Sequence, residues 1–234
     1  MKKYDIFLFD ADGTLFDFNM AETSALQAVF DSCGLCYTED ILLKYRQISA
    51  PLWRCYEKGK ITMEDLLVLR WVHLFNELGI CYDAGDFGAK YLNELGEGTS
   101  LIDGAPEICE DIVSCNKQLY IVTNGIFTTQ KSRIENSAIG KYISGFFVSG
   151  AIGFPKPHIS FFEHVFSHIP QITKDRILIV GDSLSADIAG GHNAGIDSCW
   201  LNISGASNET DIIPTYEISA LSELHELINP QQLS

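Results

Sequence analysis

The stretch that decides the fold is Tyr4-Asp5-Ile6-Phe7-Leu8-Phe9-Asp10-Ala11-Asp12-Gly13-Thr14. The run Tyr4–Phe9 is almost continuously apolar, which predicts a short β-strand buried on both faces. Asp10 and Asp12 follow directly, and Gly13 allows the backbone to turn sharply beside them. Taken alone, the two aspartates could be turn-forming acids, or they could be carboxylates that the strand delivers to a functional site.

Further apolar runs predict strands of the same kind, separated by helical patterns. The strands are Leu119–Thr123, Phe146–Ser149, Ile177–Gly181, Ser198–Leu201 and, more weakly, Thr215–Ile218; the helices are Pro106–Asn116, Thr128–Ala138, Ile159–Phe166 and Ser185–Ala194. Alternation of strand and helix is typical of parallel strands joined by right-handed crossovers. We therefore predict an α/β fold with a doubly wound parallel sheet.

One connection of this sheet is too long for a simple crossover. Between Asp10 and Leu119 lie 108 residues, whereas a whole βαβ unit takes ~30 or a little more. The surplus carries apolar residues at helix spacing in four segments, Ala21–Ser32, Thr38–Gln47, Thr62–Leu78 and Asp83–Leu95. The segment Gly96–Thr99 resembles a hinge. The predicted organisation is a catalytic core of residues 1–16 and 99–234 and an inserted helical cap of residues 17–98.

The bulk properties limit the partners. The 234 residues contain 31 acids against 16 bases, a net charge of −15, which disfavours nucleic-acid polymers and anionic membrane surfaces as partners. The start of the chain lacks the apolar run of a targeting signal. Seven scattered cysteines suit reduced thiols, and the lone pair Cys33 and Cys36 is interpreted as packing thiols. We expect a cytoplasmic protein, either a monomer or a homodimer.

Polar residues also follow the other predicted strands. They are Thr123 with Asn124, Lys156, Asp182 with Ser183, and Asp187 one turn further on. Ligands of open parallel sheets bind outside the carboxyl ends of the strands. There, Asp10, Asp12 and Asp182 would repel one another unless a cation sat among them, and Mg²⁺ is the cation that combines carboxylates with a phosphate. The pattern therefore predicts a magnesium and phosphate site.

The same residues suit phosphoryl transfer. Lys156 supplies a positive charge for a phosphoryl oxygen, and the Thr123 hydroxyl and the Asn124 amide supply hydrogen bonds. Asp10, at the end of the strand, suits the nucleophile, and Asp12 suits the general acid and base that handles the leaving oxygen and the water. The segment Gly181-Asp182-Ser183 could instead be only a helix cap. Asp187 could orient Lys156 or a metal-bound water, or it could be a solvated acid.

These motifs together resemble the haloacid dehalogenase superfamily, in the branch with a helical cap after the first strand. The four motifs occur in the family's order: Asp10-x-Asp12-Gly13-Thr14, Thr123-Asn124-Gly125, Lys156-Pro157 and Gly181-Asp182-Ser183-x-x-x-Asp187. The resemblance implies a Rossmann-like core and Mg²⁺ held by Asp10, the Asp12 carbonyl and Asp182, with Asp187 and Ser183 in support.

Within the family the likeness is greatest to bacterial 5′-nucleotidases that act on pyrimidine nucleoside monophosphates. It is carried by Ala50-Pro51-Leu52-Trp53, by Tyr56-Glu57-x-Gly59-x-Ile61-Thr62 and by Asp187-Ile188-x-Gly190-Gly191-x-Asn193-Ala194-Gly195. The implied substrate is a small phosphorylated metabolite. The alternatives are a sugar-phosphate or phosphoglycolate phosphatase, a phosphomutase, or a non-catalytic phosphate-binding module.

Three predicted cap residues have no assigned role from sequence. Trp53 and Tyr56 could stack on a base or could form the cap's core, as aromatic side chains of small helical domains often do. Arg46 could be a surface charge or a group that reads the substrate.

Overall fold

The strands form one parallel sheet in the computed structural model, which describes residues 3–169 and 173–229. The described strands are β1 (Ile6–Phe9), β2 (Gln118–Thr123), β3 (Gly145–Val148), β4 (Ile177–Gly181), β5 (Asp197–Leu201) and β6 (Tyr216–Ile218), in the order β3-β2-β1-β4-β5-β6. All neighbouring strands pair in parallel, and β1 lies between β2 and β4. The predicted α/β class and its parallel sheet are confirmed.

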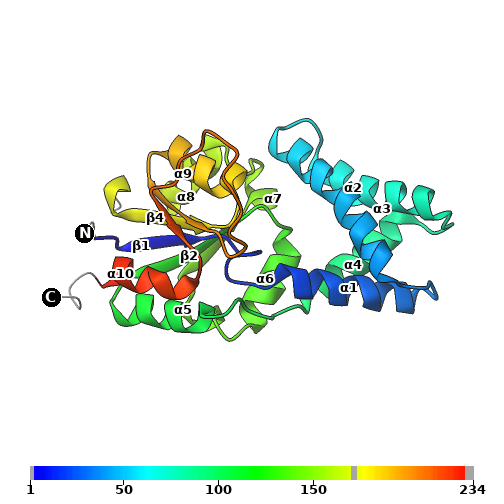
Figure 1. The fold of residues 1–234 in the computed structure, drawn as a ribbon, viewed down its shortest axis with the longest axis horizontal. Helices are drawn as coiled ribbons and strands as arrows, with labels where there is room; N and C mark the ends of the chain where they lie inside the picture. Colours follow the sequence, from blue (N-terminus) through cyan, green and yellow to red (C-terminus); the bar gives the residue numbers. More distant parts are fainter. Residues whose placement is uncertain (1–2, 170–172, 230–234) are drawn as a thin grey trace.

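Helices cover both faces of the sheet, which explains why β1 is apolar without alternation. On one face, α5 (Ala105–Ser114) and α10 (His225–Ile228) cover Phe7 and Phe9; on the other, α8 (Ile159–His168) and α9 (Ala189–Ala194) cover Ile6 and Leu8 (Figure 1). Successive residues of a strand face opposite sides. Each face therefore receives its own apolar core, and the strand ends are fixed firmly.

The remaining elements of the core are short. They are α6 (Phe127–Asn136), α7 (Ser149–Ile152), three 3₁₀ turns (Gly140–Tyr142, Lys174–Arg176 and Leu221–Leu224) and a π-helical turn at Leu184–Ile188. The predicted helix Ser185–Ala194 therefore begins as a π-helical turn and becomes α-helical at Ala189. The wide π turn brings the Asp187 carboxylate back to the start of the turn, where the Ser183 amide donates a hydrogen bond to Asp187 Oδ2 at 3.1 Å.

Four helices between β1 and α5 form a second unit at one end of the molecule (Figure 1). They are α1 (Phe18–Ser32), α2 (Glu39–Glu57), α3 (Met63–Leu78) and α4 (Ala84–Gly96), and they share a core of their own around Trp71, Phe30 and Phe87. Helix α2 runs ten residues beyond its predicted end at Gln47, through Pro51. Pro51 faces solvent, while Tyr45 and Tyr56 stay buried on either side of it.

The two connections between this helical unit and the sheet run side by side. The Asp17 amide donates to the Ser100 carbonyl at 2.9 Å, and the Ile102 amide donates to the Leu15 carbonyl at 3.0 Å. The boundaries 17–98 predicted for the cap fall at this paired crossing. The ends of the predicted core, at residues 1 and 234, lie outside the described residues.

Two further predictions concern the cysteines and the membrane. All seven cysteines are free thiols, but Cys36 is exposed, so its interpretation as a packing thiol is wrong. Among the described helices, none combines the length and the apolar character that crossing a bilayer requires.

Candidate active site

The floor of the site is a buried ion-pair network at the carboxyl end of β1. Lys156 Nζ donates to Asp10 Oδ1, to Asp187 Oδ1 and to the Val122 carbonyl, each at 2.6 Å. The Lys156 side chain is 1% exposed and Asp187 is buried equally well. A buried cation is tolerable when every donor has a partner. Lys156 therefore holds one oxygen of Asp10 in place at the end of its strand.

Lys156 stays charged because of these partners. Burial alone would lower the pKa of Lys156, but the carboxylates of Asp10 and Asp187 more than offset it and raise the pKa. The Asn124 side chain fixes the lysine's backbone from both sides: Nδ2 donates to the Lys156 carbonyl at 2.9 Å, and Oδ1 accepts from the Lys156 amide at 2.8 Å. The Asn124 side chain is therefore engaged, and its backbone amide is the group left to face a phosphate.

The acidic residues are arranged as a cation site. Oxygens of Asp10, Asp182 and Asp187 lie within 4.8 Å of one another. Gly13 has φ +83° there, and a Cβ on it would lie 2.6 Å from Asp182 Oδ2, so only glycine fits. Both carboxylate oxygens of Asp187 already accept hydrogen bonds, one from Lys156 and one from the Ser183 amide. The carboxylates left to hold a metal are therefore Asp10 and Asp182. Hard oxygen donors in this number fit Mg²⁺.

The proton affinity of the cluster reflects its excess of negative charge. Burial among neighbouring side chains is the main cause that raises the pKa of Asp182 to about 7, and the negative charge of Asp187 is the second cause. Solvent nevertheless reaches the Asp182 side chain through the pocket. Burial also raises the pKa of Asp10, against the opposing effect of Lys156. Both groups hold their protons more tightly in the folded chain than in the unfolded chain. The stability that the Asp182 proton provides is complete below about pH 4 and is lost as the pH rises through 7.

This charge crowding predicts a pH-dependent effect of Mg²⁺ on stability. At pH 8 Asp182 is ionised and is repelled by Asp187, so Mg²⁺ both gains a ligand and relieves that repulsion; at pH 6 it competes with a proton on Asp182. We expect the Mg²⁺-induced rise in Tm to be larger at pH 8 than at pH 6 by about 2–4 °C, measured by calorimetry. Asp182→Asn should remove the difference. Equal shifts of the wild-type chain at both pH values would contradict the assignment.

Asp12 is held by a different set of side chains, all from α6. Gln130 Nε2 donates to Asp12 Oδ2 at 2.6 Å, and Arg133 Nη1 donates to Oδ1. Arg133 is completely buried, and its Nε also donates to the Gly98 carbonyl at 2.8 Å. The side chain of Asp12 is thus oriented from the core side, and only its backbone carbonyl is left for a metal.

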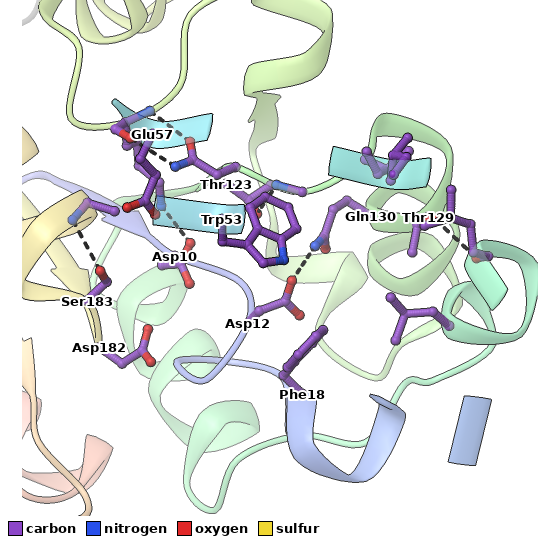
Figure 2. A pocket seen from close by; sticks show the side chains of 18 of the residues that line it. Asp10, Asp12, Phe18, Trp53, Glu57, Thr123, Thr129, Gln130, Asp182 and Ser183 are labelled. Carbon is purple, nitrogen blue, oxygen red and sulfur yellow. Dashed lines mark hydrogen bonds and ion pairs between the residues drawn. The ribbon is translucent and has the colours of Figure 1, made fainter. Parts of the chain in front are cut away.

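A pocket lies over this floor, with the four-helix unit as its opposite wall. The sheet side contributes the predicted residues Asp10, Asp12, Thr123, Asn124, Lys156, Asp182, Ser183 and Asp187. The helical side contributes Phe18, Trp53, Glu57, Leu67, Arg70 and Tyr91, with two leucines of α4. Figure 2 shows Asp10, Asp12, Trp53 and Gln130 pointing around one common space. The structure therefore brings all the predicted site residues together in one cavity.

The structure gives different positions to the three cap residues whose roles the sequence did not decide. Trp53 lines the pocket. Tyr56 is instead buried, with its hydroxyl 3.2 Å from Ser149 Oγ, so it joins the cap to the core. Arg46 pairs with Glu22 at 2.6 Å and does not line this pocket.

Several residues at the site were not predicted from the sequence, among them Glu57, Arg70, Gln130 and Arg133. Glu57 lies within the quoted cap segment, next to Tyr56, but nothing in the segment shows which side chain enters the pocket. Burial raises the pKa of Glu57, with the Asp187 charge adding to it. Gln130 and Arg133 are one helical turn apart, and this spacing is the only signal that both face the same partner.

Comparisons with known proteins cover nearly all of the chain. A model of haloacid dehalogenase-like hydrolases matches residues 7–201. YfnB of Bacillus subtilis is 41% identical over 98% of this chain and 97% of its own length. Two pyrimidine 5′-nucleotidases, PynA of Streptococcus pneumoniae and YjjG of Escherichia coli, are 32% and 30% identical, each over 97% of this chain and 95% and 98% of their own.

The structural comparison extends to the helical unit. A crystal structure of YfnB bound to magnesium superposes with a TM-score of 0.91 and covers 97% of this chain and 100% of that one. The similarity therefore includes both the sheet and the inserted helices, so the pocket between them belongs to the shared architecture.

Proposed function

Because the chain belongs to the haloacid dehalogenase-like hydrolase family, we propose that it is a Mg²⁺-dependent phosphomonoester hydrolase with Asp10 as the nucleophile. One observation carries this proposal. Asp10 lies at the pocket floor with Oδ1 fixed by Lys156 at 2.6 Å, and no hydrogen bond within the described residues reaches Oδ2. A carboxylate with one oxygen anchored and the other free is poised to attack an electrophile.

The chemistry runs in two steps. Asp10 Oδ2 forms a bond to phosphorus as the bond to the ester oxygen breaks, and Asp12 gives that oxygen its proton. Asp12 then takes a proton from water, the water oxygen bonds to phosphorus, and the Asp10–phosphorus bond breaks to release phosphate. Lys156, whose three N–H groups are already bonded, stabilises the phosphoryl oxygens through its positive charge, and the Thr123 hydroxyl can donate to one of them. Asp10, Asp182 and the Asp12 carbonyl would hold Mg²⁺, which would supply further positive charge for these oxygens.

We propose pyrimidine nucleoside 5′-monophosphates as the preferred substrates. PynA and YjjG, which are named for this activity, support the proposal. The shape of the pocket supports it too. A charged floor for a phosphate faces a helical wall with the partly exposed Trp53, a flat surface of the kind a base stacks on. The helical unit would act as a cap that covers the substrate and excludes water.

A panel of phosphate esters tests the substrate class. With Mg²⁺ present we expect kcat/KM for UMP and dTMP to exceed that for AMP, ribose 5-phosphate and phosphoglycolate by about 10-fold or more, measured by phosphate release. EDTA should abolish the release, and 2-chloropropionate should yield no halide. A higher kcat/KM for a sugar phosphate or phosphoglycolate than for UMP and dTMP would contradict the nucleotidase assignment. If no ester were turned over, a non-catalytic binding role would be favoured.

A further inference from the structure

Arg70 of α3 has an unused hydrogen-bonding edge at the pocket wall. Its side chain lines the pocket and is only 3% exposed. Nη1 donates to the Tyr45 hydroxyl at 3.1 Å. Nε and Nη2, which together form one side of the planar guanidinium, are shielded from solvent and have no hydrogen-bond partner within the described residues.

The surroundings of Arg70 balance its charge but not its hydrogen bonds. The guanidinium carbon lies 5.0 Å from the Trp71 ring centroid and 5.1 Å from that of Tyr91, at cation–π distance. The buried carboxylate of Glu22, which Arg70 also stabilises, is bonded by Arg46. A buried charged donor without an acceptor is costly to stability. Such a group calls for an explanation, and a ligand that supplies the acceptor is one.

The position of Arg70 indicates which part of a substrate could supply it. The phosphate end of the pocket is set by Asp10 and Lys156 on the sheet side. Of the described helical-unit residues that line the pocket, Arg70 is the one cation, and the leucines around it, including Leu67, offer no hydrogen bond. A molecule that places its phosphate at the floor would turn its other end toward this wall.

We infer, resting on the proposed function, that Arg70 recognises the C2 carbonyl oxygen of a pyrimidine base. This oxygen is common to uracil, thymine and cytosine, whereas adenine has no carbonyl. Two N–H groups on one side of a guanidinium converge on a single carbonyl oxygen, or on the adjacent O2 and N3 of cytosine. This recognition requires the guanidinium to turn within the pocket wall so that this edge meets the base. Arg70 is thus a specificity residue.

The test removes either partner of the proposed hydrogen bond. Arg70→Met keeps the unbranched stem and deletes the donors; 2-thio-UMP keeps the shape of UMP and weakens the acceptor. We expect Arg70→Met to lose about 10- to 100-fold in kcat/KM for UMP, the effect of a charge-assisted hydrogen bond, and to keep its rate on ribose 5-phosphate. The wild-type enzyme should prefer UMP to 2-thio-UMP by a similar factor, and Arg70→Met should not distinguish them.

Controls separate recognition from folding. Lys44→Met removes a cap cation whose side chain is 44% exposed and should change none of these ratios. Arg70→Lys, which keeps the charge but not the paired donors, should behave as Arg70→Met. Equal losses of kcat/KM on UMP and ribose 5-phosphate in Arg70→Met would overturn the inference. It would also be overturned if the wild-type enzyme lost kcat/KM on 4-thio-UMP but not on 2-thio-UMP. If the wild-type enzyme released phosphate from esters but not from pyrimidine nucleotides, the proposed substrate class would fail before any variant was compared, and the inference with it.

Discussion

Asp10→Asn should lower kcat for UMP by about 10⁴-fold or more, because an amide cannot form the covalent bond to phosphorus. Asparagine has the size and shape of aspartate and can still accept a hydrogen bond from Lys156 Nζ, now 2.6 Å from Asp10 Oδ1. The network on the floor should therefore survive, and the loss should be chemical. Phosphate release under saturating UMP and Mg²⁺ measures it.

A matched substitution on the same segment provides the control. Asp5→Asn makes the same chemical change just before β1, at the end of the strand away from the pocket, where Asp5 is half-exposed and pairs with Arg176. It should keep a rate close to that of the wild-type enzyme, since exposed ion pairs contribute little. Thermal unfolding should show both variants folded. A folded Asp10→Asn enzyme that kept its rate would exclude Asp10 as the nucleophile.

The floor of the site was predictable from sequence because it rests on local rules. A strand buried on both faces is continuously apolar, so β1, β2 and β4 stand out, and polar residues at their carboxyl ends must meet at one edge. The inserted helices were predictable for a different reason. The length between Asp10 and Leu119 exceeds any crossover, and the excess has helical periodicity.

The opposite wall and the support of Asp12 were not predictable because they depend on long-range packing. Arg133 and Asp12 are 121 positions apart in the sequence. Arg133 also lies in a helix whose sequence is mostly polar, so the neighbouring residues do not indicate that its side chain is completely buried. Helix α2 passes through Pro51 because its buried face continues beyond it, an outcome that proline's usual effect on helices argues against. Trp53 and Glu57 reach the pocket only because of that continuation.

Arg133→Met should lower kcat for UMP by about 10²-fold, although Arg133 does not line the pocket. General acid–base catalysis contributes roughly 10²–10⁴-fold, and it depends on where the catalytic group is held. Arg133 and Gln130 bind both oxygens of Asp12, and Arg133 stabilises the carboxylate that remains once Asp12 has given up its proton. Because Arg133 also bonds the Gly98 carbonyl, it fixes Asp12 relative to the exit of the helical unit.

Proton transfer can be separated from general damage by changing the leaving group. The nucleoside alkoxide of UMP needs a proton as it departs, whereas 4-nitrophenolate does not, so Arg133→Met should lose clearly less activity on 4-nitrophenyl phosphate than on UMP. The ratio is measured within one variant, so any fraction of unfolded protein cancels. In an Asp12→Asn background, Arg133→Met should cause little further loss, because residues that act through one group are not additive. Equal losses on both esters, or full additivity with Asp12→Asn, would show that Arg133 stabilises the fold without positioning the proton donor.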